Sequence, residues 1–256
     1  MKEARQLVQA LVILPTYNEI GNLGNMVEAI LSQGSNFDVL VIDDGSPDGT
    51  GLLADHLKEV HGGRVEVIHR QGKLGLATAY LAGFRYGLQR GYEYVFEMDA
   101  DFSHNPAYLP QFLETMQTQG ADLVLGSRYV SGGGAIRWPW YRKVISRGGS
   151  LYASRMLGVD LRDLTGGFKC FRRSVLETIN LESIQSSGYG FQIEMTYRAV
   201  ESGFKVVEMP IVFEERREGQ SKMSPAIFLE AFWMVAKMRA EHVAKGADAQ
   251  PERLRP

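Results

Sequence analysis

The chain has 256 residues, enough for one large α/β domain or two small ones, and its 45% hydrophobic and 23% charged content is typical of a globular protein. A net charge of −2 argues against a nucleic-acid partner, and the lone Cys170 excludes an intrachain disulfide and favours a reducing compartment. The sequence shows neither a signal-peptide pattern nor an apolar run of the ~18 residues that a membrane span needs, so we expect a cytoplasmic protein.

Short apolar runs alternate with helix-like segments over the first half of the chain. Strands are predicted at residues 10–14, 39–42, 65–68, 94–98 and 122–126. Helices are predicted between them, from a cap at Asn18 or Asn22 to about 33, and at 52–60, 72–90 and 107–119. Pro15 is expected to end the first strand. This alternation predicts an α/β fold with right-handed βαβ units, a mainly parallel central sheet and helices on both faces.

Polar clusters follow three of these strands, at residues 16–19, 43–46 and 99–101. We expect them to line one edge of the sheet, where open α/β sheets bind ligands. Asp99 and Asp101 can both turn toward one hard cation, because Mg²⁺ or Mn²⁺ is typically held by one or two carboxylates plus substrate phosphates. The pattern therefore predicts a metal–diphosphate site, with two solvated loop aspartates as the alternative.

The glycine and histidine patterns argue against other nucleotide and metal sites. No Gly-x-Gly-x-x-Gly follows the first strand and no Gly-Lys-Ser/Thr P-loop occurs, which disfavours NAD-binding and P-loop proteins. The five histidines lack zinc spacing, and His104 is interpreted as a turn residue rather than a metal ligand.

Aromatic and basic residues gather after the glycines at 132–134. Trp138, Trp140 and Tyr141 lie near four cations, which are Arg137, Arg142, Lys143 and Arg147. This composition suits a membrane interface or a bound phosphate, and the alternative is an exposed basic loop whose aromatic rings pack on the body. Residues 141–157 are predicted to form a helix with Arg142, Ser146 and Gly149 near one face.

Three further segments follow this helix. Residues 163–169 are predicted to form a tight turn that either approaches a ligand or connects a hairpin. Residues 189–202 are predicted to be a helix, on which Glu194 either faces inward or is exposed. Residues 205–213 resemble a strand that Pro210 interrupts.

The C-terminal part is predicted to contain a basic loop, an amphipathic helix and a tail, which gives the chain three regions. Residues 216–222 are predicted to form a basic loop that either closes over a diphosphate or is simply solvated. Residues 224–244 are predicted to form an amphipathic helix that packs on the core, lies in a membrane interface or contacts a partner. The expected division is a catalytic domain at 1–222, the amphipathic helix at 223–245 and a disordered tail at 246–256.

Six motifs occur in order along the chain. They are Pro-Thr-Tyr-Asn-Glu at 15–19, Asp-Asp-Gly-Ser-Pro-Asp-Gly-Thr at 43–50, Asp-Ala-Asp at 99–101, Gly-Ser-Arg-Tyr at 126–129, Trp-Pro-Trp-Tyr-Arg at 138–142 and Arg-Arg-x-Gly-x-Ser-Lys at 216–222. The set resembles the dolichol-phosphate (polyprenol-phosphate) mannosyltransferases, which are family 2 inverting glycosyltransferases with a GT-A fold. The resemblance implies transfer of mannose from GDP-mannose to a dolichyl or polyprenyl phosphate with Mg²⁺ or Mn²⁺. It also implies peripheral association with the cytoplasmic face of a membrane, and small membrane subunits as candidate partners.

The resemblance assigns roles by position. The positions implied to contact the donor nucleotide-sugar are Pro15, Tyr17, Glu19, Ile42, Asp44, Asp99, Ala100, Asp101, Arg216 and Lys222. Those implied to hold the acceptor phosphate are Arg128, Arg142 and Ser146. The implied metal ligands are Asp99, Asp101 and Ser103, and the implied catalytic residues are Asp99, Asp101 and Arg128.

The chain departs from this family pattern in two places. Many relatives have a glutamine where Ser103 stands, so water is an alternative metal ligand here. Some relatives continue into transmembrane helices, and this chain stops, as short members do. The processive-synthase motif Gln-x-x-Arg-Trp is absent, which argues against a polymerase. Two other functions stay open: transfer of another sugar, such as glucose from UDP-glucose, and a non-catalytic nucleotide-sugar-binding or membrane-adaptor protein.

Overall fold

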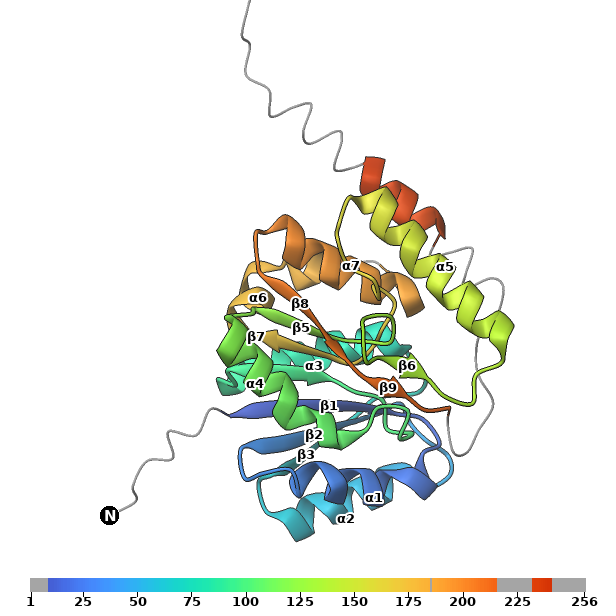
Figure 1. Ribbon diagram of the computed structural model, residues 1–256. Coiled ribbons are helices and arrows are strands. Elements are labelled where there is room, and N and C mark those ends of the chain that lie inside the picture. Colours follow the sequence, from blue (N-terminus) through green and yellow to red (C-terminus); the bar gives the residue numbers. More distant parts are fainter. Residues whose placement is uncertain (1–8, 185, 216–231, 241–256) are drawn as a thin grey trace, which may run out of the picture.

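The computed structural model describes residues 9–184, 186–215 and 232–240. The strands of its main sheet are β1 (Ala10–Thr16), β2 (Phe37–Asp43), β3 (Val65–His69), β4 (Tyr94–Glu97), β5 (Leu123–Ser127), β7 (Lys169–Arg172) and β8 (Val206–Pro210). They are ordered β3-β2-β1-β4-β7-β5-β8, and β7 alone among them runs antiparallel to its neighbours (Figure 1). A small parallel sheet pairs β6 (Gly134–Ala135) with β9 (Val212–Phe213). The predicted α/β fold with a mainly parallel sheet is confirmed.

Helices cover both faces of the main sheet. They are α1 (Ile20–Leu31), α2 (Thr50–His61), α3 (Leu76–Arg90), α4 (Leu109–Gln119), α5 (Trp140–Leu157), α6 (Arg173–Thr178) and α7 (Gly188–Glu201). Short 3₁₀ turns occur at Pro106–Tyr108 and Leu181–Ser183, and residues 232–240 are helical beside α5. None of the helices in the described part of the chain is long and apolar enough to cross a membrane.

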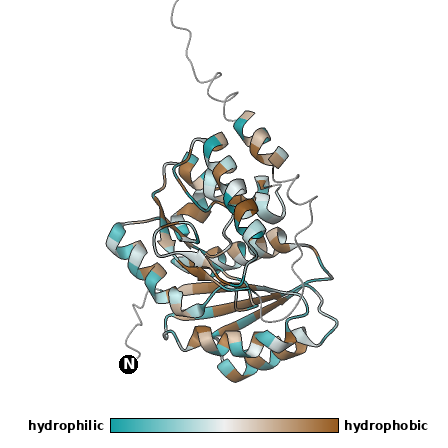
Figure 2. Cartoon of the chain, turned by 45° about the vertical axis from the view of Figure 1, so that its right-hand side comes forward, coloured by the Kyte–Doolittle hydropathy of each residue, from teal (hydrophilic) through white to brown (hydrophobic). Residues whose placement is uncertain are grey.

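Alternation along each buried strand builds two hydrophobic cores. In β1, Val12 and Leu14 pack with α1, α2 and α4, whereas Leu11 and Ile13 point to the other face and pack with α3, α5, α6 and α7. The strands are apolar on both faces, which is why they are mainly brown in Figure 2. Burial on both faces holds the sheet rigid, and the polar loops lie at the carboxyl ends of its strands.

The first strand does not end at Pro15. It continues to Thr16 because β1 pairs with β4 only up to Ile13, whereas its pairing with β2 runs to Thr16. Pro15 therefore has a strand neighbour on one side only, and a missing N–H is tolerated on the open side.

The predicted asparagine cap of the first helix is wrong. Asn18 adopts a left-handed backbone with φ of 61°, and Asn22 is buried inside α1. The orphan N–H groups at the helix start are instead bound by the loop after β2: Thr50 Oγ1 accepts from Glu19 N–H at 2.9 Å and Asp48 Oδ2 from Ile20 N–H at 3.3 Å. The loops after β1 and β2 are thus joined.

The turn predicted at residues 163–169 leads into β7, a strand that the sequence pattern did not reveal. β7 lies between β4 and β5, and its Lys169 stands directly across from Glu97 of β4. Both side chains are fully buried, and Lys169 Nζ also donates to the Gln192 carbonyl at 2.6 Å. Burial raises the pKa of Glu97 to about 7 and lowers that of Lys169 to about 8, and the opposite charge of each partner counteracts the shift of the other. Two buried groups of opposite charge thus stand on neighbouring strands just before Asp99.

The C-terminal prediction is described only in part. Residues 232–240 are helical, as predicted for 224–244. The rest of that helix, the loop at 216–222 and the tail at 246–256 lie outside the described residues, so the proposed three-part division stays a prediction.

Candidate active site

A cavity of about 360 Å³ lies where β1, β2 and β4 end. The residues predicted for the site that line it are Pro15, Tyr17, Glu19, Asp44, Asp99, Ala100, Asp101, Ser103, Arg128 and Arg142. Parallel strands deliver the first eight of these from one sheet edge. The structure thus brings acidic and basic groups that are distant in sequence into one hollow.

Two predicted site residues, Ile42 and Ser146, lie elsewhere, and two more are not among the described residues. Ile42 is fully buried in the core formed with α3 and does not line the cavity. Ser146, on α5, lines a second and more apolar cavity of about 340 Å³. Arg216 and Lys222 lie outside the described residues.

The acidic loop after β4 is held in a tight conformation by its own side chains. Asp101 Oδ1 accepts the Ser103 N–H at 3.0 Å, and Phe102 between them adopts a left-handed φ of 62°. His104, interpreted from the sequence as a turn residue, is buried, and its Nδ1 accepts the Asp99 N–H at 3.0 Å. Since Nδ1 accepts, its imidazole carries its proton on Nε2 in the neutral form. The ring stacks on Phe168 at 4.9 Å, so His104 fixes the backbone of Asp99.

The oxygen donors of this loop fit a hard divalent cation. Asp99 and Asp101 supply carboxylates, and the buried hydroxyl of Ser103, whose residue also lines the cavity, has no hydrogen-bond partner among the described residues. Within that same part of the chain, no three His, Cys, Asp or Glu side chains are grouped to hold a metal by themselves. A site with two protein carboxylates is the kind that Mg²⁺ occupies together with substrate phosphates.

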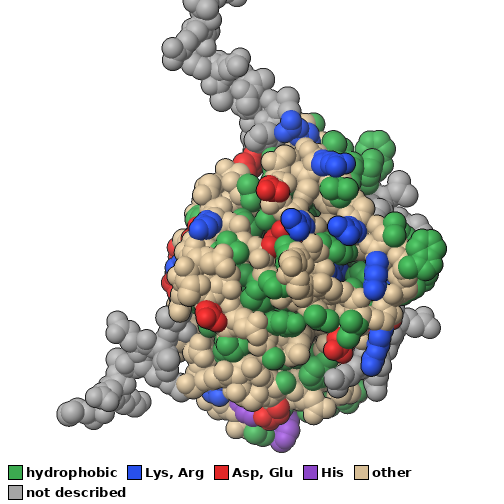
Figure 3. Space-filling model, viewed as in Figure 1, with side chains coloured by type: hydrophobic (Ala, Val, Ile, Leu, Met, Phe, Trp, Pro, Cys, Tyr) green, Lys and Arg blue, Asp and Glu red, His purple; other side chains and the backbone are tan. Residues whose placement is uncertain are grey.

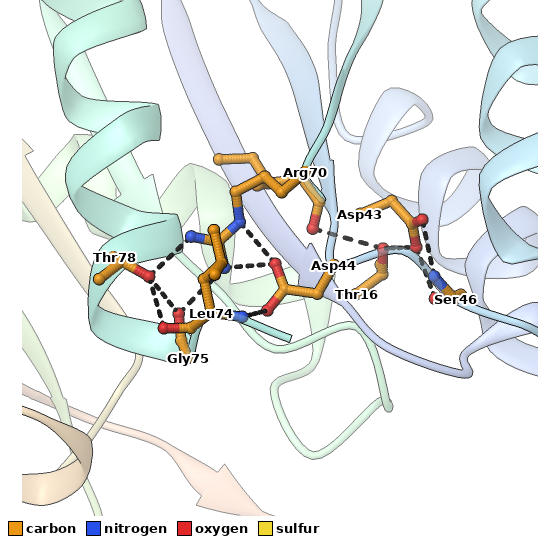
Figure 4. Close-up of polar contacts among 9 residues, drawn as sticks. Thr16, Asp43, Asp44, Ser46, Arg70, Leu74, Gly75 and Thr78 are labelled. Carbon is orange, nitrogen blue, oxygen red and sulfur yellow. Dashed lines mark hydrogen bonds and ion pairs between the residues drawn. The ribbon is translucent and has the colours of Figure 1, made fainter. Parts of the chain in front are cut away.

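Asp44 is engaged by the loop that follows β3 (Figure 4). Its Oδ1 accepts from Arg70 Nε at 2.5 Å and forms an ion pair with the same guanidinium, while Oδ2 accepts the Leu74 N–H at 3.2 Å. Arg70 in turn donates to Thr78 Oγ1 at 2.7 Å and to the Gly75 carbonyl at 3.0 Å. Asp44 therefore holds residues 70–75 against the rim of the cavity.

That loop carries a cation to the cavity. Lys73 lines it, and the Lys73 ammonium lies 4.6 Å from the centroid of the Tyr17 ring, close enough for a cation–π contact. A flexible ammonium at the mouth of an acidic hollow can bind the phosphates of an anionic ligand that the carboxylates alone would repel.

We expect Lys73→Met to weaken the binding of a nucleoside diphosphate about 10-fold. The methionine keeps most of the aliphatic stem but removes the charge, and with it a charge-assisted hydrogen bond to the ligand and the cation–π contact with Tyr17. Calorimetric titration with GDP and Mn²⁺ measures this effect. Lys205→Met is the matched control, since Lys205 lies at the opposite edge of the sheet and its Nζ donates to the Gln119 carbonyl. Equal affinity in both variants would contradict a phosphate-binding role for Lys73.

Arg128, directly after β5, is oriented by a buried carboxylate. Its Nε and Nη2 donate to the two oxygens of Asp163 at 2.7 and 2.6 Å, and its backbone N–H donates to Asp163 Oδ2 at 2.9 Å. Nη2 also donates to Thr165 Oγ1 at 3.0 Å. Burial disfavours the guanidinium charge, but the Asp163 carboxylate outweighs burial and holds the pKa of Arg128 above its ordinary value. The arginine is thus a fixed, permanent cation in the cavity wall.

Arg142, in the first turn of α5, is the second cation of that wall. Its guanidinium lies 4.2 Å from the centroid of the Trp138 ring and donates to Glu215 Oε1 at 2.9 Å. The Arg128 guanidinium lies 5.3 Å from the same ring, so Trp138 is flanked by both arginines. The two cations together can bind a doubly charged anion.

Several residues that shape the site were missed from the sequence. They are Arg70, Lys73, Asp163, Thr165, Tyr189 and Gln192. Asp163 and Thr165 belong to the Asp-Leu-Thr-Gly-Gly turn. One of the two interpretations of that turn, a close approach to a ligand, points to this region but gives neither side chain a role. Arg70 and Lys73 carried no such signal, because isolated basic residues in a loop are usually solvated.

Comparisons with known proteins agree with this architecture. The family model of glycosyl transferase family 2 matches residues 11–179. A polyprenol monophosphomannose synthase of Mycolicibacterium smegmatis is 49% identical over 233 residues, which are 91% of this chain and 88% of the relative. An undecaprenyl-phosphate mannosyltransferase of Micrococcus luteus is 50% identical over 88% of this chain and 91% of the relative. A crystal structure of glucosyl-3-phosphoglycerate synthase from Mycobacterium tuberculosis with Mn²⁺, UDP-glucose and phosphoglyceric acid covers 91% of this chain and 80% of that one, with a TM-score of 0.68 at 17% identity. That similarity shows a shared fold.

Proposed function

The chain belongs to glycosyl transferase family 2 and has the GT-A fold, and from this premise we propose that it transfers mannose from GDP-mannose to a dolichyl or polyprenyl phosphate with inversion. The observation that carries the proposal is a single cavity lined both by the carboxylates Asp99 and Asp101 and by the arginines Arg128 and Arg142. The names of the two relatives at about half identity support the choice of sugar and acceptor.

The proposed acceptor needs no general base from the protein. A phosphate monoester has a second pKa of ~6 and is largely dianionic at neutral pH, so its oxygen is already a nucleophile. Arg128 and Arg142 would hold this dianion in the cavity wall, with Arg128 kept rigid by Asp163. Ser146, which lies on the neighbouring cavity, is proposed to contact the same acceptor farther from the reacting oxygen.

The proposed transfer is an in-line displacement at the anomeric carbon. The acceptor oxygen forms a bond to that carbon as the bond to the diphosphate oxygen breaks, and the electron pair leaves with GDP. An α-linked donor then gives a β-linked lipid product. Pro15, Tyr17, Glu19 and Asp44 are proposed to bind the nucleoside, with Ile42 supporting the pocket from the core.

Asp99 and Asp101 would hold a divalent cation, Mg²⁺ or Mn²⁺, with Ala100 beside the donor and Ser103 or a water as a further ligand. When bound, the cation neutralises charge on the diphosphate leaving group. Lys73 is proposed to approach the same phosphates, and Arg216 and Lys222 of the basic loop are proposed to cover them. These cations offset the repulsion between two anionic substrates.

The acceptor chain implies a membrane nearby. We propose that the protein associates peripherally with the cytoplasmic face of that membrane, with small membrane subunits as further candidate partners. Residues 1–222 would form the catalytic unit, and the helix at 223–245 would contribute to membrane contact.

The direct test is transfer of labelled mannose from GDP-mannose to a short polyprenyl phosphate in detergent, with Mn²⁺ or with a chelator. We expect a mannosyl lipid that forms only with the metal. UDP-glucose with the same lipid is the control donor, and preferential glucose transfer would keep the fold and reassign the sugar. Tight donor binding without any transfer would instead indicate a non-catalytic binding protein.

A further inference from the structure

Three buried polar side chains that line the catalytic cavity have no well-formed hydrogen bond within the described part of the chain. They are the Ser103 hydroxyl, the Trp138 indole N–H and the side-chain amide of Gln192. Charged side chains on the face shown in Figure 3 lie at the outer surface, where water solvates them. A buried polar group lacks that compensation and costs free energy until a partner reaches it. The three groups therefore indicate a ligand that binds in the cavity.

Two of the three lie beside groups that already have a proposed ligand. Ser103 accompanies the two carboxylates that are proposed to hold the cation. The Trp138 ring is flanked by the guanidinium groups of Arg128 and Arg142, 5.3 and 4.2 Å from its centroid, where the acceptor phosphate is proposed to bind. Gln192 is the member of this set that has no assigned ligand.

Gln192, on α7, lies where the metal end and the acceptor end of the cavity meet. A Cβ atom at Gly167 would lie 3.6 Å from Gln192 Nε2 and 3.7 Å from Cε1 of His104, whose Nδ1 holds the metal-binding loop. Thr165, two residues before this glycine, accepts a hydrogen bond from Arg128 at 3.0 Å. The transferred sugar must lie between these ends, because its anomeric carbon receives the acceptor oxygen as the diphosphate leaves.

The side-chain amide of Gln192 keeps hydrogen-bonding capacity for a ligand. The backbone carbonyl of Gln192 accepts from Lys169 Nζ at 2.6 Å and from Thr196 Oγ1 at 3.1 Å, which fixes the residue in place. The amide lies beside the Glu97 carboxylate and helps to lower the pKa of that group. Since an amide has two N–H donors and a carbonyl oxygen, this contact leaves the oxygen and one donor. A neutral donor and acceptor suit a hydroxyl, which does both, better than a phosphate dianion, which only accepts.

We propose that Gln192 is a specificity-determining residue that binds a hydroxyl of the donor sugar through its side-chain amide. The inference rests on the proposed function and deepens it, because it gives the sugar a contact of its own between the cation and the acceptor phosphate. Gly167 leaves room for the sugar ring, since a side chain at that position would extend toward Gln192 Nε2.

Gln192→Met tests the contact, because methionine keeps the length of glutamine and removes both polar atoms. We expect the Kd for GDP-mannose with Mn²⁺ to rise about 10-fold, as for one lost hydrogen bond, and the Kd for GDP with Mn²⁺ to stay unchanged. Calorimetric titration measures both constants, and unchanged GDP affinity also shows that the variant is folded. Gln111→Met is the matched control, because it makes the same substitution at an exposed position of α4.

Gly167→Ala is an independent variant that leaves Gln192 intact. The new Cβ would meet Gln192 and His104 at ordinary van der Waals distances, so the fold accommodates it. We expect it to raise the Kd for GDP-mannose at least about fivefold by occupying space that the sugar needs, again without changing the Kd for GDP.

Donors that each lack one mannose hydroxyl identify the partner of Gln192. One of the 2-, 3-, 4- and 6-deoxy analogues of GDP-mannose should bind the parent chain about 10-fold more weakly than GDP-mannose. The same analogue should bind Gln192→Met no more weakly than GDP-mannose does, because the two changes remove one shared interaction.

Equal losses of GDP and GDP-mannose affinity would place Gln192 at the diphosphate or the cation and overturn the proposal. Unchanged GDP-mannose binding in both variants, or additive losses with every deoxy donor, would overturn it as well. Failure of the proposed function has a different signature, since the parent chain itself would then transfer no mannose or would prefer UDP-glucose. UDP and UDP-glucose are therefore titrated alongside, and a loss confined to UDP-glucose would support the role of Gln192 with another sugar.

Discussion

Asp101→Asn is expected to lower kcat about 10³-fold while the protein stays folded, which corresponds to roughly 4 kcal/mol of lost transition-state stabilisation. The side chain is buried at the acidic edge of the cavity, and its Oδ1 accepts the Ser103 N–H at 3.0 Å. An asparagine keeps that acceptor oxygen and so preserves the turn. It removes the negative charge that a hard cation requires.

The experiment combines initial rates over a Mn²⁺ titration with the Kd for Mn²⁺ in the presence of GDP and with the melting temperature. Asp48→Asn is the matched control. Asp48 Oδ1 accepts the N–H of Thr50, two residues later, at 3.0 Å, as Asp101 does with Ser103, but Asp48 does not line the cavity. We expect this control to retain transfer. Near-wild-type turnover in both Asp99→Asn and Asp101→Asn would show that the metal assignment is wrong.

Much of the fold is predictable because its central strands are buried on both faces. Val39 and Val41 pack against one layer of helices and Leu40 and Ile42 against the other, so the strand is a continuous apolar run. β7 has no such pattern because its first residue is a buried lysine, Lys169. Its Nζ donates to the Gln192 carbonyl, and Glu97, 72 positions away in the sequence, stands directly across in the sheet. The cap of α1 was mispredicted for a similar reason, since the groups that accept from its first N–H groups come from the loop after β2.

The residues of the candidate site also fall into those that the local sequence predicts and those that depend on distant contacts. Asp99 and Asp101 follow a strand that is easy to identify, so position alone predicted their place at the sheet edge. Lys73 reaches the cavity only because Asp44, from the preceding strand, holds its loop through Arg70 and Leu74. Such contacts between distant residues leave no local period in the sequence. The motif resemblance fills part of this gap, because it indicates Arg128 and Arg142 from the sequence alone.

Asp163→Ala should cost about 3–5 kcal/mol of unfolding free energy and abolish measurable transfer, because it leaves the buried Arg128 guanidinium without its counterion. The carboxylate is 1% exposed and accepts three hydrogen bonds from Arg128, two from the guanidinium and one from the backbone. Chemical denaturation measures the loss of stability, and the mannose-transfer assay measures the loss of activity.

A destabilised variant could lose transfer merely by unfolding, so a second variant separates the effect on stability from the effect on the reaction. In Arg128→Met/Asp163→Leu, neither buried charge remains, and we expect most of the lost stability to return, apart from about 1–3 kcal/mol for the orphaned N–H of residue 128. Transfer should stay at least about 10²-fold below that of the parent chain, since the fixed cation proposed to hold the acceptor phosphate is gone. Recovery of both stability and transfer would mean that Arg128 serves only the fold. Recovery of stability alone supports its place in the reaction, where Asp163 acts by orienting it.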